Sequence, residues 1–240
     1  LDNVQGISEF VIAVIIDVRS FSSFAMKVGS VQTTAFLKRI YIEMIDRYFG
    51  NASFVKPTGD GLLLAFPHDE TNLKEVASYV VMSSLACLAD FAKLCDGDDM
   101  INFNTPDKVG IGISRGAATN VVSHGSTIDY SGRPFNIASR LMDLARPGGI
   151  ILDSKFGENL IPSNVKGKFS TADVYLRGIT DDDALTKIYY SKDTTVIPSE
   201  KTKLPNLLMM PVFLNESSFR FACSVAFQYL LLVIETTTWK

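Results

Sequence analysis

Residues 10–17 read FVIAVIID, a run of seven apolar residues followed by an aspartate. The run is rich in β-branched side chains and has no polar alternation, which is typical of a central strand buried on both faces. Asp17 is therefore expected where this strand leaves the core and reaches solvent. This strand is therefore predicted to be central in the fold, with the other elements packed around it.

The surrounding segments alternate between helix and strand patterns. Apolar residues recur every three or four positions over residues 31–48, which predicts an amphipathic helix. Apolar runs on both sides of TGDG at 58–61 predict a β-hairpin. The other expected elements are a helix over 71–95, a strand pair at 109–113 and 119–122, a helix over 137–145 and a strand at 150–152. This order is the βαββαβ arrangement of a ferredoxin-like α+β fold, an antiparallel sheet with flanking helices.

The composition changes near residue 192. Residues 1–191 are predicted to form one domain, and residues 192–240 a polar linker followed by an apolar C-terminal tail of unknown role. Within the tail, residues 221–234 form a run of 14 with only two polar side chains. This is shorter than the ~20 residues of a membrane-spanning helix. We favour a packing helix or strand here over an interfacial membrane anchor or a partner-binding segment.

The composition also restricts the partners and the compartment. The chain has 240 residues, 47% of them hydrophobic, and a net charge of -3, so no global positive field attracts nucleic acid or an anionic membrane. Three cysteines without Cys-x-x-Cys spacing and two histidines do not predict a zinc site, and they fit a reducing compartment. His68 is expected in a surface loop. No signal-peptide pattern is visible, and we expect a cytoplasmic protein.

Two aspartates are predicted to meet at one end of the sheet. Asp17 follows the central strand, and Asp60 lies between two glycines in the hairpin turn. If the hairpin pairs with the central strand, the two carboxylates converge and repel each other in a site of low dielectric. Divalent cations relieve that repulsion, and oxygen ligands favour Mg²⁺ or Mn²⁺. Two such ions side by side can promote displacement at phosphorus.

A second group of polar residues lies in the stretch DYSGRPFNIASRL at 129–141. Pro134 suits the first turn of a helix, so Asn136 and Arg140, four residues apart, share one face. Apolar residues cover the other face. An amide and a guanidinium on one helix face can hold a ribose oxygen and a charged phosphoryl transition state.

Residues 17–21, 54–61 and 132–140, taken together, resemble the catalytic domain of the class III nucleotidyl cyclases. The resemblance covers residues 7–191. It implies that Asp17 and Asp60 bind two divalent cations, Mn²⁺ or Mg²⁺, with the backbone carbonyl of Val18 as a further ligand. The substrate is then a nucleoside triphosphate, and the product is its cyclic monophosphate.

The same resemblance implies roles for the remaining residues. Asn136 orients the ribose and Arg140 stabilises the charge at phosphorus, while Lys56 and Asp129 contact the base. Arg177, in LRGI at 176–179, takes the place of a lysine that contacts the triphosphate. Family active sites form between two subunits, with the metal aspartates from one and the Asn and Arg from the other. Because this chain carries all of them, a homodimer with two interfacial sites is implied.

The identity of the base follows less directly. Lys56 donates and ionised Asp129 accepts hydrogen bonds, a pair that suits adenine, cytosine or uracil but not guanine. The longer sequence patterns around these residues, DYSGRPxNxASRLMDLARP and FxKPTGDGLL, are similar to those of the pyrimidine cyclases of bacterial anti-phage (Pycsar) systems. That resemblance implies cyclic UMP or cyclic CMP as a second messenger in defence, with UTP favoured slightly over CTP.

Other interpretations stay open. The first is an adenylate cyclase that makes cyclic AMP from ATP. The second is a cyclase-like nucleotide-binding module that has lost turnover, which the intact Asp17, Asp60, Asn136 and Arg140 disfavour. The third is a diguanylate cyclase or polymerase-palm enzyme, whose Gly-Gly-Asp/Glu-Glu-Phe signature is missing from the hairpin.

Overall fold

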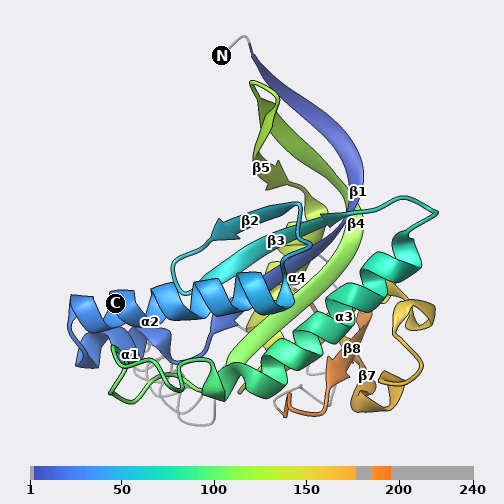
Figure 1. Ribbon diagram of the computed structural model, residues 1–240. Coiled ribbons are helices and arrows are strands. Elements are labelled where there is room, and N and C mark those ends of the chain that lie inside the picture. Colours follow the sequence, from blue (N-terminus) through green and yellow to red (C-terminus); the bar gives the residue numbers. More distant parts are fainter. Residues whose placement is uncertain (1–2, 177–184, 196–240) are drawn as a thin grey trace, which may run out of the picture. The chain divides into compact units, whose positions relative to one another are not determined.

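The computed structural model describes residues 3–176 and 185–195 (Figure 1). These residues form an eight-stranded sheet in the order β2-β3-β1-β4-β6-β8-β7, with β5 paired to β4. The strands are β1 (Val4–Val18), β2 (Phe54–Pro57), β3 (Gly61–Pro67), β4 (Val109–Ser123), β5 (Ser126–Ser131), β6 (Gly149–Asp153), β7 (Phe169–Val174) and β8 (Thr186–Ser191). The helices are α1 (Phe21–Lys27), α2 (Ser30–Glu43), α3 (Leu73–Asp90) and α4 (Arg133–Leu144). Short helical turns are Met44–Tyr48, Phe91–Lys93, Ser154–Phe156, Glu158–Leu160 and Lys166–Lys168.

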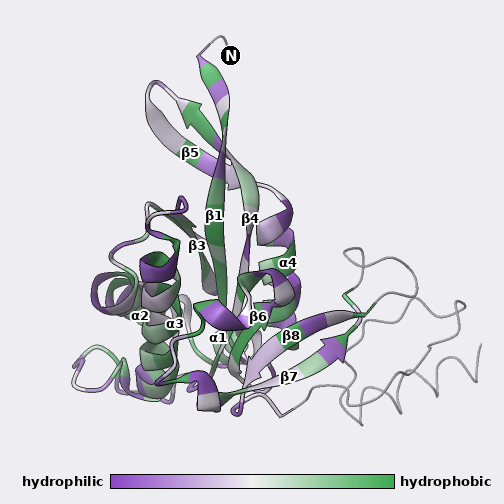
Figure 2. Ribbon diagram, turned by 90° about the vertical axis from the view of Figure 1, so that its right-hand side faces the viewer, coloured by the Kyte–Doolittle hydropathy of each residue, from purple (hydrophilic) through white to green (hydrophobic). Residues whose placement is uncertain are grey.

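The apolar run at residues 10–16 is the middle of β1, as predicted. It pairs antiparallel with β3 on one side and with β4 on the other. All side chains from Val11 to Ile16 are buried, which agrees with a strand covered on both faces, but Phe10 at the start of the predicted run is exposed. Figure 2 shows this apolar middle part of β1 between α2 and α3 on one side and α4 on the other.

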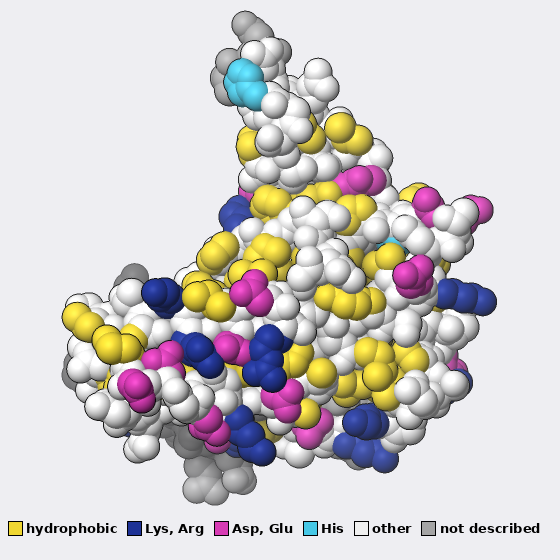
Figure 3. All heavy atoms as spheres, in the orientation of Figure 1, with side chains coloured by type: hydrophobic (Ala, Val, Ile, Leu, Met, Phe, Trp, Pro, Cys, Tyr) yellow, Lys and Arg dark blue, Asp and Glu magenta, His cyan; other side chains and the backbone are white. Residues whose placement is uncertain are grey.

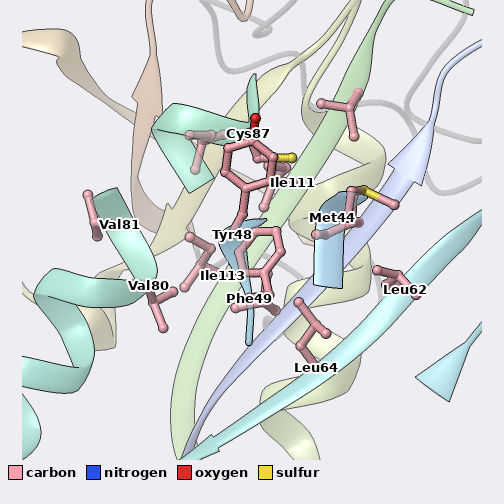
Figure 4. Packing of buried hydrophobic residues seen from close by; sticks show 14 of the residues in the cluster. Met44, Tyr48, Phe49, Leu62, Leu64, Val80, Val81, Cys87, Ile111 and Ile113 are labelled. Carbon is pink, nitrogen blue, oxygen red and sulfur yellow. The ribbon is translucent and has the colours of Figure 1, made fainter. Parts of the chain in front are cut away.

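Alternate residues of β1 enter two separate hydrophobic clusters. Ile12, Val14 and Ile16 pack with residues of α2 and α3, while Val11 and Ala13 pack with residues of α4. Figure 4 shows part of the larger cluster, with side chains from β3, α3, β4 and the turn after α2 pointing toward one another. The period of two along a strand thus assigns each helix to its face of the sheet.

The βαββαβ order and the flanking helices are confirmed by β1, α1–α2, β2, β3, α3 and β4. The sheet is antiparallel at each pairing except that of β4 with β6, which is parallel. One detail of the prediction is wrong: residues 109–113 and 119–122 are not two strands but one, β4. Its partner at the far end is β5, and a register shift interrupts their pairing at Val121/Val122.

Helix α3 with its following turn, Leu73–Lys93, meets the length and hydropathy of a bilayer-spanning helix. It lies on the sheet as a core helix, however, with Ala77, Val80, Val81 and Cys87 buried. Burial raises the pKa of the Cys87 thiol to about 12, so it is an inert core thiol.

Several sequence-based predictions fall at the margins of this structure. Arg177 and the apolar run at 221–234 lie outside the described residues, and the boundary after residue 191 stays a prediction. His68 follows β3 in a loop as expected, but it is half-buried rather than fully exposed, and its ring lies 6.1 Å from that of Phe10.

Candidate active site

The strand pairing brings Asp17 and Asp60 to the same end of the sheet. Asp17 is paired with Gly61 across β1 and β3, and the backbone N–H of Val18 donates a 3.0 Å hydrogen bond to the carbonyl of Asp60. Each of the two glycines in the turn is required for a different structural reason. Gly59 has φ +94°, and a Cβ on Gly61 would lie 1.9 Å from the carbonyl oxygen of Ile16. The GDG sequence therefore permits the close approach that the sequence analysis predicted.

The Asp60 carboxylate is one of the groups that shift the pKa of Asp17. Burial raises the pKa of Asp17 above its ordinary value, the Arg19 guanidinium lowers it, and the Asp60 carboxylate raises it again. Two acids near each other at the end of a buried strand form a site where a divalent cation would relieve both burial and repulsion.

Arg19 is the site residue that the sequence analysis missed. The prediction assumed that no cation lay near the two acids, but Arg19 Nη1 lies 2.6 Å from Asp17 Oδ2. The Arg19 side chain is only 5% exposed. The sequence did contain a sign of this contact: Arg19 is two residues after Asp17, and residues i and i+2 of an extended chain point to the same face.

The donor set fits a hard divalent cation. It consists of the carboxylates of Asp17 and Asp60, and the Val18 carbonyl beside them is the third ligand implied by the resemblance. Among the described residues, no group of three or more acidic, histidine or cysteine side chains could enclose a metal on its own. Mg²⁺ in phosphate-transfer sites is commonly held by one or two carboxylates plus substrate phosphates and water, which agrees with this sparse set.

Asn136 and Arg140 lie on the exposed face of α4, as predicted. Phe135, Ile137, Ala138 and Leu141 are buried on the opposite side. The helix begins after Gly132, which has φ +150°, where a Cβ would lie 3.0 Å from the Cα of Ala118. Within residues 3–176 and 185–195, Arg140 forms no ion pair with either Asp17 or Asp60, and it is absent from the charges that shift the pKa of Asp17. The two acids, Asp17 and Asp60, thus form one group in the chain, and the α4 residues Asn136 and Arg140 form a separate one.

Lys56 and Asp129 are brought together although 73 residues separate them. Lys56 Nζ lies 2.7 Å from Asp129 Oδ2, and both side chains are nearly half exposed. The hydrogen bond from Lys56 lowers the pKa of Asp129, so the carboxylate is ionised at neutral pH. The contact places a donor and an acceptor side by side at the surface between β2 and β5.

Two aromatic rings accompany this pair. Phe54 precedes Lys56 on β2 and Tyr130 follows Asp129 on β5, and their ring centroids lie 5.5 Å apart. Tyr130 is 6% exposed and donates its hydroxyl hydrogen to Glu9. Both rings pack against the cluster under α4, so they act as core residues located beside the Lys56–Asp129 pair.

Comparison with known proteins agrees with this architecture. No protein-family model and no curated protein matches the chain. Among solved structures, the adenylyl cyclase CyaB from P. aeruginosa is similar with a TM-score of 0.64 and 19% identity, over 80% of this chain and 98% of that chain. The guanylyl cyclase Cya2 has a TM-score of 0.60 and 18% identity, over 78% of this chain and 93% of that chain. The guanylate cyclase domain of RhGC from Catenaria anguillulae, in complex with GTP, has a TM-score of 0.56 and 18% identity, over 79% of this chain and 100% of that chain.

The chain has the fold of a class III cyclase catalytic domain. At these identities the comparisons establish the fold, and they include adenylyl and guanylyl cyclases alike. The roles of the individual residues rest on the sequence motifs and on the geometry above. For Arg177, which lies outside the described residues, only the motif supports a role.

Proposed function

We propose that this protein is a nucleotide cyclase that converts a nucleoside triphosphate to the 3',5'-cyclic monophosphate and pyrophosphate. The observation that carries the proposal is the convergence of Asp17 and Asp60 at the shared end of β1 and β3, on a cyclase fold. Two neighbouring carboxylates that can hold a pair of cations favour an active enzyme over a nucleotide-binding module that has lost turnover.

The proposed reaction is an intramolecular displacement. The ribose 3'-oxygen bonds to the α-phosphorus and loses its proton to water, and the bond between the α-phosphorus and the oxygen that bridges it to the β-phosphorus breaks to release pyrophosphate. Two Mn²⁺ or Mg²⁺ ions, when bound, lower the pKa of the attacking hydroxyl and neutralise charge on the phosphates. In this chain Asp17, Asp60 and the Val18 carbonyl would hold those ions.

Residues of α4 would complete the site. Asn136 is a hydrogen-bonding partner for the ribose, and Arg140 provides the cation for the developing charge at phosphorus. Arg177 remains the proposed contact to the triphosphate. These groups stabilise the transition state more than the ground state, which is the requirement for a faster reaction.

The active form is proposed to be a homodimer. Arg140 forms no ion pair with either acid of its own chain, which supports an arrangement in which the α4 face of a second copy completes the site. An arm made of the far ends of β1, β4 and β5 extends beyond the helical layers (Figure 1). It exposes Val4, Ile7, Phe10 and Ile128, which are 43–56% accessible, and Figure 3 shows hydrophobic side chains at the surface near its base. Such a surface suits a second copy of the same chain.

The proposed substrate is UTP, then CTP, and the alternative is ATP. Lys56 and Asp129, once separated from each other, offer hydrogen bonds that suit uracil, cytosine or adenine, and the Phe54 and Tyr130 rings, which occupy volume beside them, favour the smaller pyrimidine bases. A cyclic pyrimidine nucleotide would act as a second messenger in anti-phage defence. We place the enzyme in the cytoplasm, where nucleoside triphosphates are available.

The deciding experiment offers the protein each of the four nucleoside triphosphates with Mn²⁺ and identifies the products by mass. A cyclic monophosphate together with pyrophosphate is expected from UTP or CTP. The same reaction with Asp60→Asn is the control for a contaminating cyclase. No cyclic product from any of the four substrates, with a folded dimer and bound Mn²⁺, would contradict the proposed function.

A further inference from the structure

Arg19 is the most deeply buried charged group near the acid pair. It lies one residue beyond β1, with its side chain 5% exposed. Nη1 contacts Asp17 Oδ2 at 2.6 Å, and Nη2 donates to the carbonyl of Ala145 at 3.0 Å and to that of Met142. A single guanidinium therefore joins the end of β1 to the last turn of α4 and the residue after it.

The surrounding chain leaves a fitted space for this guanidinium. Gly110 of β4 is paired with Asp17 of β1, and a Cβ on Gly110 would lie 1.8 Å from Arg19 Nη2. The guanidinium thus lies against the bare backbone of β4, and a side chain at position 110 would require it to shift. Arg19 Nε is buried without a hydrogen-bond partner among the described residues.

The energetics argue against a role in stability alone. Taking a guanidinium out of water is unfavourable, and buried ion pairs are often replaced by apolar residues without loss of stability. The carbonyls at a helix C-terminus do attract a cation, but a more exposed lysine could serve that purpose at less desolvation. What Arg19 provides is geometry, since its planar fork holds a carboxylate and two carbonyls in fixed directions.

We propose that Arg19 is a positioning residue, which holds the Asp17 carboxylate for cation binding and ties it rigidly to the α4 helix that carries Asn136 and Arg140. This inference rests on the proposed function. Oδ2 of Asp17 is engaged by Arg19, whereas Oδ1 accepts no hydrogen bond from the described residues. Arg19 therefore acts on the cation through Asp17, as the outer partners of metal ligands commonly do.

The homodimer gives this link a second consequence. One chain supplies Asp17 to one active site and Asn136 and Arg140 to the other. Because Arg19 joins Asp17 to α4 within one chain, it connects the cation-binding Asp17 of one active site to the Asn136 and Arg140 that this chain supplies to the other active site. Loss of the link is therefore expected to affect both the binding of cations and the rate of the reaction.

The test compares Mn²⁺ binding without nucleotide, measured from the electron paramagnetic resonance signal of free Mn²⁺, in wild type and in Arg19→Met. Positioning predicts binding weakened by ~10-fold, with kcat reduced to a similar degree. A purely electrostatic role predicts the opposite sign, because removal of a neighbouring positive charge would tighten binding of a cation. Equal or tighter Mn²⁺ binding by Arg19→Met would overturn the proposal.

Two further variants complete the design. Arg19→Lys keeps the charge but lacks the fork, so it should bind Mn²⁺ as weakly as Arg19→Met; recovery of wild-type affinity would also overturn the proposal. If Arg19→Met does not fold as a dimer, Arg19→Lys decides alone. Arg39→Met is the matched control, because Arg39 also joins a carboxylate, Glu43 at 2.9 Å, to a backbone carbonyl, Leu94 at 3.1 Å. It should leave Mn²⁺ binding unchanged.

Failure of this proposal can be told apart from failure of the proposed function. If wild type binds Mn²⁺ in a manner that requires Asp60 but cyclises no nucleotide, the function is wrong and the Arg19 comparison still stands. If wild type binds no Mn²⁺ at all, with or without nucleotide, the positioning role is overturned as well.

Discussion

The backbone N–H of Val18 donates a 3.0 Å hydrogen bond to the carbonyl oxygen of Asp60. This contact joins the end of β1, which carries Asp17, to the turn before β3. The two acids are therefore fixed relative to each other by the backbone of the sheet and not by their side chains. Variants of Asp60 should consequently leave the fold in place, whereas variants of Asp17 also remove the partner of the buried Arg19, so their folding is checked by circular dichroism.

We predict that Asp17→Asn and Asp60→Asn each lower kcat by about a thousandfold, equivalent to about 4 kcal/mol, since each removes a ligand of a cation that stabilises the transition state. Cyclic nucleotide is measured by mass and pyrophosphate by a coupled assay. Asp173→Asn, at an exposed position on β7, is the control and should retain wild-type turnover. Near-normal turnover by either active-site variant would show that the acids do not hold the cation.

We predict that two inactive chains restore each other. In an equal mixture of Asp17→Ala and Arg140→Ala with free subunit exchange, half of the dimers are mixed and each has one intact site, which gives about a quarter of wild-type activity. A mixture of Asp17→Ala with Asp60→Ala should stay inactive, because both changes damage the same half of each site. Recovery in the second mixture, or its absence in the first despite proven exchange, would mean that the site is not shared between chains.

We predict a smaller effect for Tyr41→Phe. The hydroxyl of Tyr41 in α2 donates to the carbonyl of Gly59, one residue before Asp60. Burial and the Asp60 carboxylate raise the pKa of Tyr41, so the hydroxyl remains a donor throughout the neutral range. Loss of one hydrogen bond, about 1 kcal/mol, should weaken Mn²⁺ binding about fivefold.

The matched control for this variant is Tyr79→Phe. Tyr79 likewise donates its hydroxyl to a backbone carbonyl, that of Tyr48 at 2.7 Å, but it belongs to α3 and contacts neither acid. It should lower thermal stability slightly and leave Mn²⁺ binding unchanged. Equal effects of the two variants on Mn²⁺ binding would mean that Tyr41 supports only the fold.

The elements that were predictable from the sequence have strong local signals. The apolar run before Asp17 and the glycines around Asp60 specify a buried strand and a tight turn without reference to distant residues. The hairpin then pairs with β1, and the convergence of the acids follows from the topology.

The length of β4 was not predictable in the same way. Its glycines resemble turn signals, but a Cβ on Gly112 would lie 1.9 Å from the carbonyl oxygen of Ala138, so this glycine allows α4 to approach the sheet. Arg19 was missed for a related reason, because its carbonyl partners on α4 lie more than 120 residues away. Contacts between segments that are far apart in the sequence produce no periodic pattern of residues, so they cannot be predicted from such patterns.

The last prediction concerns the base. The Lys56–Asp129 pair must separate, or move aside together, for a base to bind between the donor and the acceptor. Tyr130 cannot easily move away to make room for a larger base, since it is buried, contacts Phe54 and Phe135, and donates a hydrogen bond to Glu9. A pyrimidine needs less depth than a purine to reach both polar groups.

We therefore predict that UTP or CTP has a kcat/KM with Mn²⁺ at least about tenfold above that of ATP. A hydrogen bond between the base and a charged group such as Lys56 or Asp129 contributes about 1.5–3 kcal/mol, so a factor of about ten to a hundred for each contact is expected. Phe54→Ala should reduce this preference by opening space beside Lys56, whereas Phe169→Ala, at the opposite edge of the sheet on β7, should not. If ATP is the best substrate of the wild-type enzyme, the pyrimidine assignment is wrong and the adenylate cyclase alternative stands, with the roles of Asp17, Asp60, Asn136 and Arg140 unaffected.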